Sequence, residues 1–247
     1  MKKRRKHRRF ICNLLTCFFA ALFVFSAYML YKELQPRIAA KKQYEQLAQR
    51  AIQPEMKNPI CFAYLMERNK DTVAWIQIED SNINYPIVQG EDNNFYLYNG
   101  FDKKTGSGGS IFMDWQNNSS FKDKNTILFG HHMKDGSMFN NLKYFKEQDF
   151  AQQHTITIYT PDYIRSYTVF AVCNIKANEN YLQISFDKEA SFLRYCQKMI
   201  LRSTIQTNIR LKRTDSILTL STCDYTQEND RLVIFARLSS CVKVLSH

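Results

Sequence analysis

One cysteine ends an alternating apolar run near the C-terminus, and one arginine begins the next run. If SILTLSTC (216–223) is a strand, Ser221 and Cys223 share one of its faces, because successive side chains alternate. A hairpin with RLVIFARL (231–238) would bring Cys223 and Arg231 to the same end of the sheet. A guanidinium stays charged and carries several fixed N–H donors, so it can hold a thiolate or the oxyanion of a tetrahedral intermediate. The pattern is compatible with a nucleophilic cysteine, although taken by itself it favours the alternative, a buried structural cysteine beside a surface arginine.

A pair of histidines follows another run of strand-forming residues. NTILFGHHMKDGSMF (125–139) is typical of a strand that ends at Gly130 and places His131 and His132 before the turn KDG. A cysteine with its ordinary pKa of about 8.5 is mostly protonated at neutral pH, so a nucleophilic cysteine needs a nearby base or cation. Histidine can act as that base and later protonate a leaving amine. A solvated turn and a metal site are the alternatives, although no carboxylate or cysteine cluster lies near the two histidines in sequence.

The basic residues are concentrated at the N-terminus. The net charge is +11, and seven Lys and Arg among residues 1–9 leave only +4 for the rest of the chain. Phosphate binding needs cations gathered on one face of a folded domain, which this distribution does not provide. We therefore expect no nucleic-acid partner.

Residues 10–31 carry no charge and follow this basic tail. As a helix, 22 residues would extend roughly 33 Å, against about 30 Å for the hydrocarbon core of a bilayer. A cleavable signal peptide is the competing interpretation, but its apolar part is usually about 7 to 15 residues long, and no clear small-x-small site follows here. The stretch predicts an uncleaved transmembrane signal anchor. The positive-inside rule then places residues 1–9 in the cytoplasm and the rest of the chain, 32–247, outside the cell membrane.

The seven cysteines show no CxxC pair and no zinc-cage spacing. Five lie beyond residue 31, an odd number, so at least one thiol is unpaired within a monomer. No acidic loop has the spacing that suits calcium. We therefore expect no metal and no cofactor. Buried free thiols are expected at Cys61, Cys173, Cys196 and Cys241.

The elements that must position these residues change from helical to strand-like at Thr72. A helix is expected at about 38–52, ended by Pro54 and Pro59, and a short one in CFAYLMERN (61–69). A later helix is expected within 186–202, with Asp187 as its N-cap. The other runs favour eight strands, which suggest an antiparallel barrel or sandwich because no βαβ alternation occurs. The expected strands are 72–80, 83–90, 109–115, 125–132, 155–160, 164–175, 216–223 and 231–238.

TLSTC with an arginine eight residues later, and GHHMKDGSMF about 90 residues earlier, resemble the sortases, the cysteine transpeptidases of Gram-positive cell surfaces. The resemblance covers about Asn69 to Leu238, including WIQIEDSNINYPIVQGEDNNFYL, and is nearest to class B, whose traits include the helix near 187–201. It implies a mainly β fold, a closed antiparallel-type eight-stranded sortase β-barrel with N-terminal helices and one inserted helix before the last strands. The expected divisions are a basic cytoplasmic tail (1–9), a transmembrane anchor (10–31), an extracellular helical stalk with N-terminal helices (32–70), the catalytic domain (71–240) and a C-terminal tail (241–247).

The resemblance also implies roles for individual residues. Cys223 corresponds to the nucleophile, His131 to the general acid/base, and Arg231 to the residue that holds the oxyanion or positions the substrate. His132 receives no role. Contacts to the sorting peptide are expected from Ser221, Thr222, Asn93, Leu97, Tyr181 and Leu182.

The reaction implied by this resemblance is transpeptidation. The thiolate attacks the carbonyl after Thr in an NPxTN-like sorting signal of a secreted surface protein, and an amine of a peptidoglycan precursor or cross-bridge resolves the acyl-enzyme. One alternative is an exported cysteine peptidase that hydrolyses its substrate. The other is a membrane-tethered binding scaffold whose site is catalytically silent.

Overall fold

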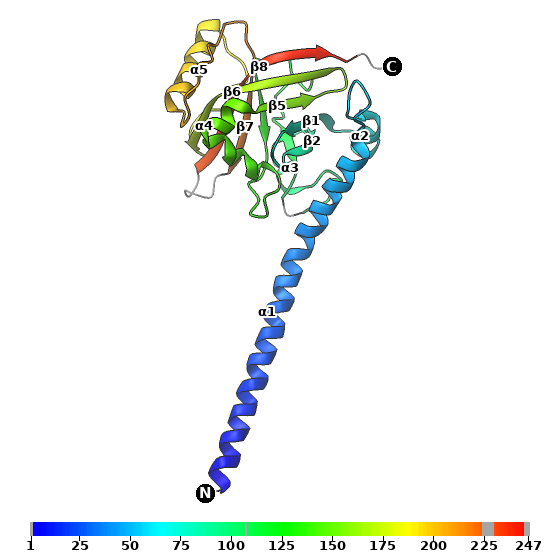
Figure 1. The fold of residues 1–247 in the computed structure, drawn as a ribbon, viewed down its shortest axis with the longest axis vertical. Coiled ribbons are helices and arrows are strands. Elements are labelled where there is room, and N and C mark those ends of the chain that lie inside the picture. Colours follow the sequence, from blue (N-terminus) through cyan, green and yellow to red (C-terminus); the bar gives the residue numbers. More distant parts are fainter. Residues whose placement is uncertain (1, 107, 224–229, 245–247) are drawn as a thin grey trace.

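A long N-terminal helix leads away from a β-barrel (Figure 1). The computed structural model describes residues 2–106, 108–223 and 230–244. Helix α1 (Lys2–Ala51) joins the two predicted helical segments into one element and continues through Pro36. From Phe10 onward α1 is long and apolar enough to cross a membrane, and its apolar side chains up to Tyr31 are exposed. A membrane anchor and a signal sequence both have this property.

The last turns of α1 dock on the barrel. Tyr44, Leu47 and Ala51, which share one helical face, are buried there. The short helix α2 (Phe62–Arg68) follows, as the sequence predicts, and buries Phe62 and Leu65. The helical N-terminal part of the chain therefore buries its apolar positions against the barrel.

All eight predicted strands are present and close into a barrel in the order β1-β2-β3-β4-β7-β8-β6-β5. The pairings β2–β3 and β4–β7 are parallel, so the barrel is mixed, and the antiparallel-type description needs this correction. The chain between the paired strands is long in both cases, which is what a parallel connection requires. The strands are β1 (Thr72–Ile78), β2 (Asn84–Val88), β3 (Ile111–Met113), β4 (Asn125–Phe129), β5 (Thr155–Tyr159), β6 (Tyr163–Lys176), β7 (Ile217–Cys223) and β8 (Asp230–Lys243).

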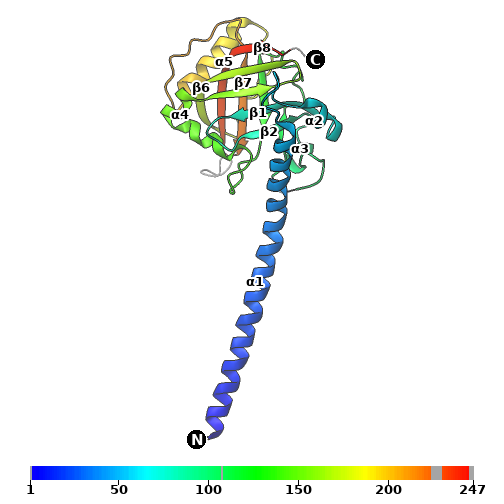
Figure 2. The same ribbon diagram turned by 45° about the vertical axis from the view of Figure 1, so that its right-hand side comes forward.

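Strand alternation divides β7 between two cores. Leu218 and Leu220 point into the barrel, whereas Ile217 belongs to a second cluster outside it. Helix α5 (Glu189–Arg202), the predicted inserted helix, completes this outer cluster. Both views place α5 on the side of the barrel away from the end of α1 (Figures 1 and 2). The face of β7 that carries Ser221 is consequently covered by the segment that contains α5.

Three helices were not expected from the sequence: α3 (Phe95–Tyr98), the 3₁₀ helix η1 (Phe139–Lys146) and α4 (Gln148–Gln153). Each is too short to give a helical period. The predicted capping by Asp187 is wrong, since α5 begins at Glu189 with Lys188 at its N-cap. Strand β8 also continues to Lys243, beyond the expected end at 238.

Candidate active site

At one edge of the barrel, the neighbouring strands β4 and β7 finish and β8 begins. β7 is the middle strand, and its antiparallel register with β8 sets Cys223 opposite Arg231. On its other side β7 runs parallel to β4, with Ser221 opposite Phe129. The last pair of this ladder is two residues short of His131, and the same register continued that far would bring His131 level with Cys223. The backbone alone therefore aligns the cysteine, histidine and arginine that the sequence singled out.

The chain keeps this register after β4 ends. Gly130 N donates to Ser221 O (3.3 Å), and Phe139 N donates to His131 O (2.9 Å). A Cβ at Gly130 would lie 2.8 Å from Cδ2 of the buried Phe139 ring, closer than real contacts allow. Glycine at 130 therefore lets the start of η1 pack directly against the residue before His131.

The imidazole of half-buried His131 faces the main chain of α3. Its Nε2 lies 2.8 Å from the carbonyl oxygen of Leu97. A carbonyl oxygen only accepts hydrogen bonds, so Nε2 must carry the hydrogen in this contact. Nδ1 is then the nitrogen left to accept a proton in the neutral ring. The Leu97 carbonyl therefore selects the tautomer of His131.

Arg231 presents an unused donor at the same edge. Its Nε is buried and has no hydrogen-bond partner among the described residues. The hydroxyl oxygen of Thr222 is also buried and likewise has no partner among those residues. A buried donor left unpaired costs about 1–3 kcal/mol. A ligand that supplies an oxygen atom at this point would remove that cost.

The segment 177–188 between β6 and α5, here called the insertion wall, covers the outer face of β7. Tyr181 and Ser221, both expected to contact the peptide, lie with their hydroxyl oxygens 2.8 Å apart. Both residues are fully buried, and Tyr195 of α5 donates to the Tyr181 carbonyl (2.6 Å). Leu182 is half-buried and packs on both cores. In this structure Tyr181 and Ser221 thus tie the insertion wall to β7.

An ion pair joins the insertion wall to the end of α5. Arg202 at the end of α5 donates through both terminal nitrogens to Glu179 (2.6 and 3.0 Å). These hydrogen bonds lower the pKa of the Glu179 carboxyl to about 2. The carboxylate therefore stays ionised, and paired with Arg202, through the whole physiological range.

Asn93 and Leu97 lie on the opposite side, in and before α3. The Asn93 side chain donates to Asp114 (2.9 Å) and accepts from Trp115 N (3.0 Å), which fixes the turn after β3. Leu97 was expected to contact the sorting peptide, and the structure shows a further contact, between its carbonyl and His131. A main-chain acceptor leaves no signature in side-chain types, so sequence reasoning could not find this contact.

Of the four remaining thiols outside residues 1–31, two are buried as the sequence suggested and two are not. Cys173 and Cys196 are buried as expected, and burial raises their pKa values to about 11 and about 12. Cys61 is half-buried, and Cys241 is exposed, which contradicts the expectation for that residue. The two buried thiols stay protonated and are unsuited to nucleophilic attack. In the described part of the chain, no three His, Cys, Asp or Glu side chains gather closely enough to hold a metal ion.

The comparisons with known proteins agree with this architecture. The sortase domain model matches residues 76–239. Sortase B of Listeria monocytogenes is 39% identical over 178 residues, 70% of this chain and 72% of that protein. Sortase B of Staphylococcus aureus is 32% identical over 180 residues, 72% of this chain and 74% of that protein. The structure of a Staphylococcus aureus sortase B–substrate complex superposes with a TM-score of 0.76 at 30% identity, covering 85% of this chain and 100% of the other.

The chain belongs to the sortase family, and within it to class B. It is accordingly a cysteine transpeptidase. The predicted fold class is confirmed, with the mixed strand pairing as its one correction.

Proposed function

We propose that this sortase cleaves an NPxTN-like sorting signal after Thr and transfers the cleaved protein to an amine of peptidoglycan. The observation that carries the proposal is the common end of β4, β7 and β8, which aligns His131, Cys223 and Arg231. A similar Staphylococcus aureus enzyme has been solved as a sortase B–substrate complex, which supports a peptide substrate here as well.

In the acylation step, Nδ1 of His131 takes the proton of the Cys223 thiol, because Nε2 is engaged with the Leu97 carbonyl. The thiolate attacks the scissile carbonyl carbon, and the oxygen that becomes negative accepts from the guanidinium of Arg231. The protonated His131 then gives its proton to the leaving amine. The peptide bond breaks, and a thioester to Cys223 remains.

In the transfer step, the acceptor amine attacks the thioester carbonyl and His131 removes a proton from the attacking nitrogen. The tetrahedral intermediate collapses to a new amide, and the Cys223 thiolate leaves and recovers a proton from His131. Water in place of the amine gives hydrolysis. The acceptor therefore decides between a transpeptidase and a peptidase.

The same proposal includes a location. Residues 10–31 would anchor the enzyme in the cell membrane with residues 1–9 in the cytoplasm, residues 32–70 as stalk and helices, and 71–240 as the extracellular catalytic domain followed by the tail 241–247. The exposed apolar surface of α1 up to Tyr31 supports an anchor in lipid. Protease protection of the N-terminus in intact cells, with cleavage of the barrel from outside, is the result that this topology requires.

Mass spectrometry of the full chain in detergent tests the chemistry. NPxTN-like peptides should form an acyl adduct on Cys223 that moves to triglycine or to the side-chain amine of a lysine peptide. The exposed thiol of Cys241 provides a matched control: Cys241→Ala should keep the adduct, and Cys223→Ala should lose it while remaining folded. An adduct that only hydrolyses whatever amine is added would indicate a peptidase. A folded, reduced enzyme that forms no adduct would contradict the proposed substrate.

A further inference from the structure

The Leu97 carbonyl that contacts His131 is itself closely packed from behind. Gly109 has a φ of 55°, and a Cβ there would lie 2.5 Å from Leu97 O and 2.6 Å from Tyr96 O. The Gly109 backbone therefore rests directly on these two carbonyls, and only glycine permits this approach. The next residue, Ser110, donates from its backbone N to Tyr96 O (3.0 Å). The position of Gly109 thus limits where the Leu97 carbonyl can lie.

A tyrosine of α1 holds Gly109 in turn. Tyr44 OH donates to the Gly109 carbonyl (3.0 Å), accepts from Phe101 N (3.3 Å) and lies 3.3 Å from Ser110 Oγ. It connects two segments that follow α3, one at Phe101 and one at Gly109, although it is 65 residues from Gly109 in the chain. Burial raises the pKa of Tyr44 to about 12, so the hydroxyl remains a neutral donor in the physiological range.

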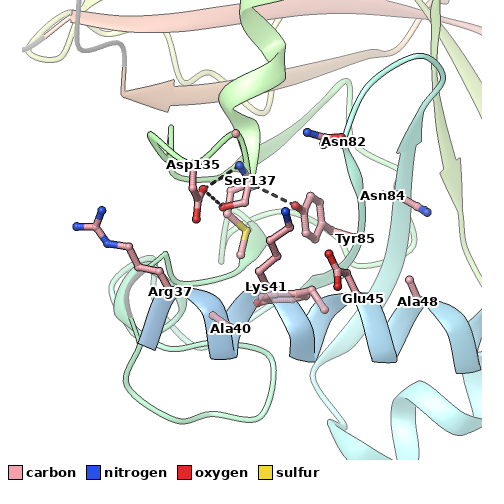
Figure 3. Close-up of a pocket in the computed structure, with 13 residues that line it drawn as sticks. Arg37, Ala40, Lys41, Glu45, Ala48, Asn82, Asn84, Tyr85, Asp135 and Ser137 are labelled. Atoms are coloured by element: carbon pink, nitrogen blue, oxygen red, sulfur yellow. Dashed lines mark hydrogen bonds between the residues drawn. The ribbon is translucent and has the colours of Figure 1, made fainter. Parts of the chain in front are cut away.

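The docking of α1 on the barrel places Tyr44 at this point. Its ring meets Tyr85 of β2 edge-on, with 5.4 Å between the centroids. A cavity of about 270 Å³ lies beside it, between α1, β2 and the turn Asp135–Met138, and Lys41 of α1 extends into this space (Figure 3). Beside this cavity, α1 buries Tyr44, Leu47 and Ala51 of its apolar face against the barrel.

A second set of contacts holds α3 without Tyr44. Asn69 donates to Tyr96 OH (2.9 Å), and Tyr96 OH donates to Asp71 (2.6 Å). These contacts fix the Tyr96 side chain, so α3 should stay folded if the Tyr44 hydroxyl is removed. What the hydroxyl adds is the restraint on Gly109, and so on the carbonyl of Leu97.

We propose that Tyr44 is a positioning residue: by holding Gly109 against α3, its hydroxyl fixes the Leu97 carbonyl that orients the His131 imidazole. The proposal rests on the proposed role of His131 as acid and base. Helix α1 would then help to set the geometry of the active site. Undocking that helix would free the carbonyl and leave the His131 ring without a fixed tautomer.

The test is Tyr44→Phe in the full chain, held in detergent micelles and labelled with ¹⁵N-histidine. The spectrum of His131→Ala identifies the His131 signals among the five histidines of the chain. Loss of the hydroxyl should move the His131 ring nitrogens from the Nε2–H tautomer toward an average of two tautomers. It should lower kcat by about 3- to 10-fold, because a small misplacement of a catalytic group is costly, and should change KM for the peptide by less than about twofold.

Tyr167→Phe is the matched control, because Tyr167 is equally buried in β6 and far along the barrel from α3. It should leave the His131 signals and kcat unchanged. Wild-type His131 signals in Tyr44→Phe would overturn the positioning role. Turnover retained in His131→Ala would instead contradict the proposed function, while the ring signals would still decide the role of Tyr44.

Discussion

On one side of the β7 end, His131 is held by main-chain atoms, the Leu97 carbonyl and the Phe139 amide. On the other side, the insertion wall is held by side chains: the hydroxyls of Tyr181 and Ser221 and an ion pair at its base. Main-chain contacts involve atoms that every residue carries, so they move little when a side chain is changed. Side-chain contacts can be lost one at a time. The first kind suits a group that must transfer protons, and the second suits a wall that admits a peptide.

The comparison predicts that changes on the histidine side alter the chemical step, whereas changes in the insertion wall alter binding. The largest effect is expected from His131→Ala, which should lower kcat/KM by about 10²- to 10⁴-fold through loss of acid and base catalysis. His132→Ala is the control, because the neighbouring residue pairs with Met138 through its backbone. Steady-state cleavage of a fluorogenic peptide gives both values, and the reverse order would show that His132 is the catalytic histidine.

Arg231→Lys should follow, with a loss of about 10²-fold in kcat/KM. The lysine keeps the charge, but it replaces the fixed guanidinium donors by a single mobile ammonium group that cannot reproduce their geometry. Arg237→Lys is a control on the same strand, because Arg237 lies opposite Ile217 at the other end of β7 and donates to the Arg210 carbonyl. A near-normal rate for Arg231→Lys would mean that charge alone is needed.

Gly109→Ala should affect both stability and rate. The new methyl group would collide with two carbonyls at a residue with positive φ, at a cost of about 1–3 kcal/mol, and displacement of the Leu97 carbonyl should lower kcat more than it raises KM. Gly106→Ala is the control, since a Cβ there meets its nearest atom at 3.9 Å. Thermal unfolding and steady-state kinetics measure the two effects. Equal behaviour of both variants would argue against a tightly packed carbonyl.

Tyr181→Phe should raise KM about fivefold with little change in kcat. Its hydroxyl bond to Ser221 is neutral, and such a bond contributes about 1 kcal/mol to the position of the insertion wall. Tyr159→Phe loses a similar bond to Gln77 on β1 and should leave both parameters unchanged. A fall in kcat without a change in KM would show that the wall takes part in the chemical step.

The smallest effect concerns pH. The Glu179 pKa is lowered from 4.5 to about 2 by Arg202, so the ion pair contributes stability above pH 4.5 that is lost as the pH falls toward 2. The protection of the amides of residues 177–188 from hydrogen exchange, relative to their intrinsic rates, should therefore fall as the pH is lowered over this interval. Glu179→Gln should exchange faster at neutral pH and lack the acid transition. An identical acid transition in that variant would assign it to another group.

The strands could be predicted because their residues alternate, and the β7–β8 hairpin because its partners are close in sequence. Strand alternation and the short connection are together enough to predict Cys223 beside Arg231. The parallel pairing of β4 with β7 joins residues about 90 apart, and here the resemblance to sortases, not periodicity, brought His131 to Cys223. The loop 224–229 that connects the hairpin lies outside the described residues.

Contacts made by backbone atoms could not be predicted. Leu97 was expected only to contact the peptide, and Tyr44 lies within the predicted helix 38–52 with no role of its own. Neither residue type indicates a carbonyl that selects a histidine tautomer or a hydroxyl that holds a glycine. Such roles depend on where distant backbone segments meet in three dimensions.

The unbroken course of α1 has a mechanical consequence. Tyr44, where the helix meets the barrel, comes 13 residues after Tyr31, where the uncharged stretch ends, which is roughly 20 Å of helix. With residues 10–31 in the membrane, as proposed, a rigid helix would hold the barrel at a fixed distance from the lipid headgroups, which a flexible linker would not do. The active site would then reach only sorting signals that lie at this distance from the membrane. The length of α1 would therefore select among substrates that are still held in the membrane.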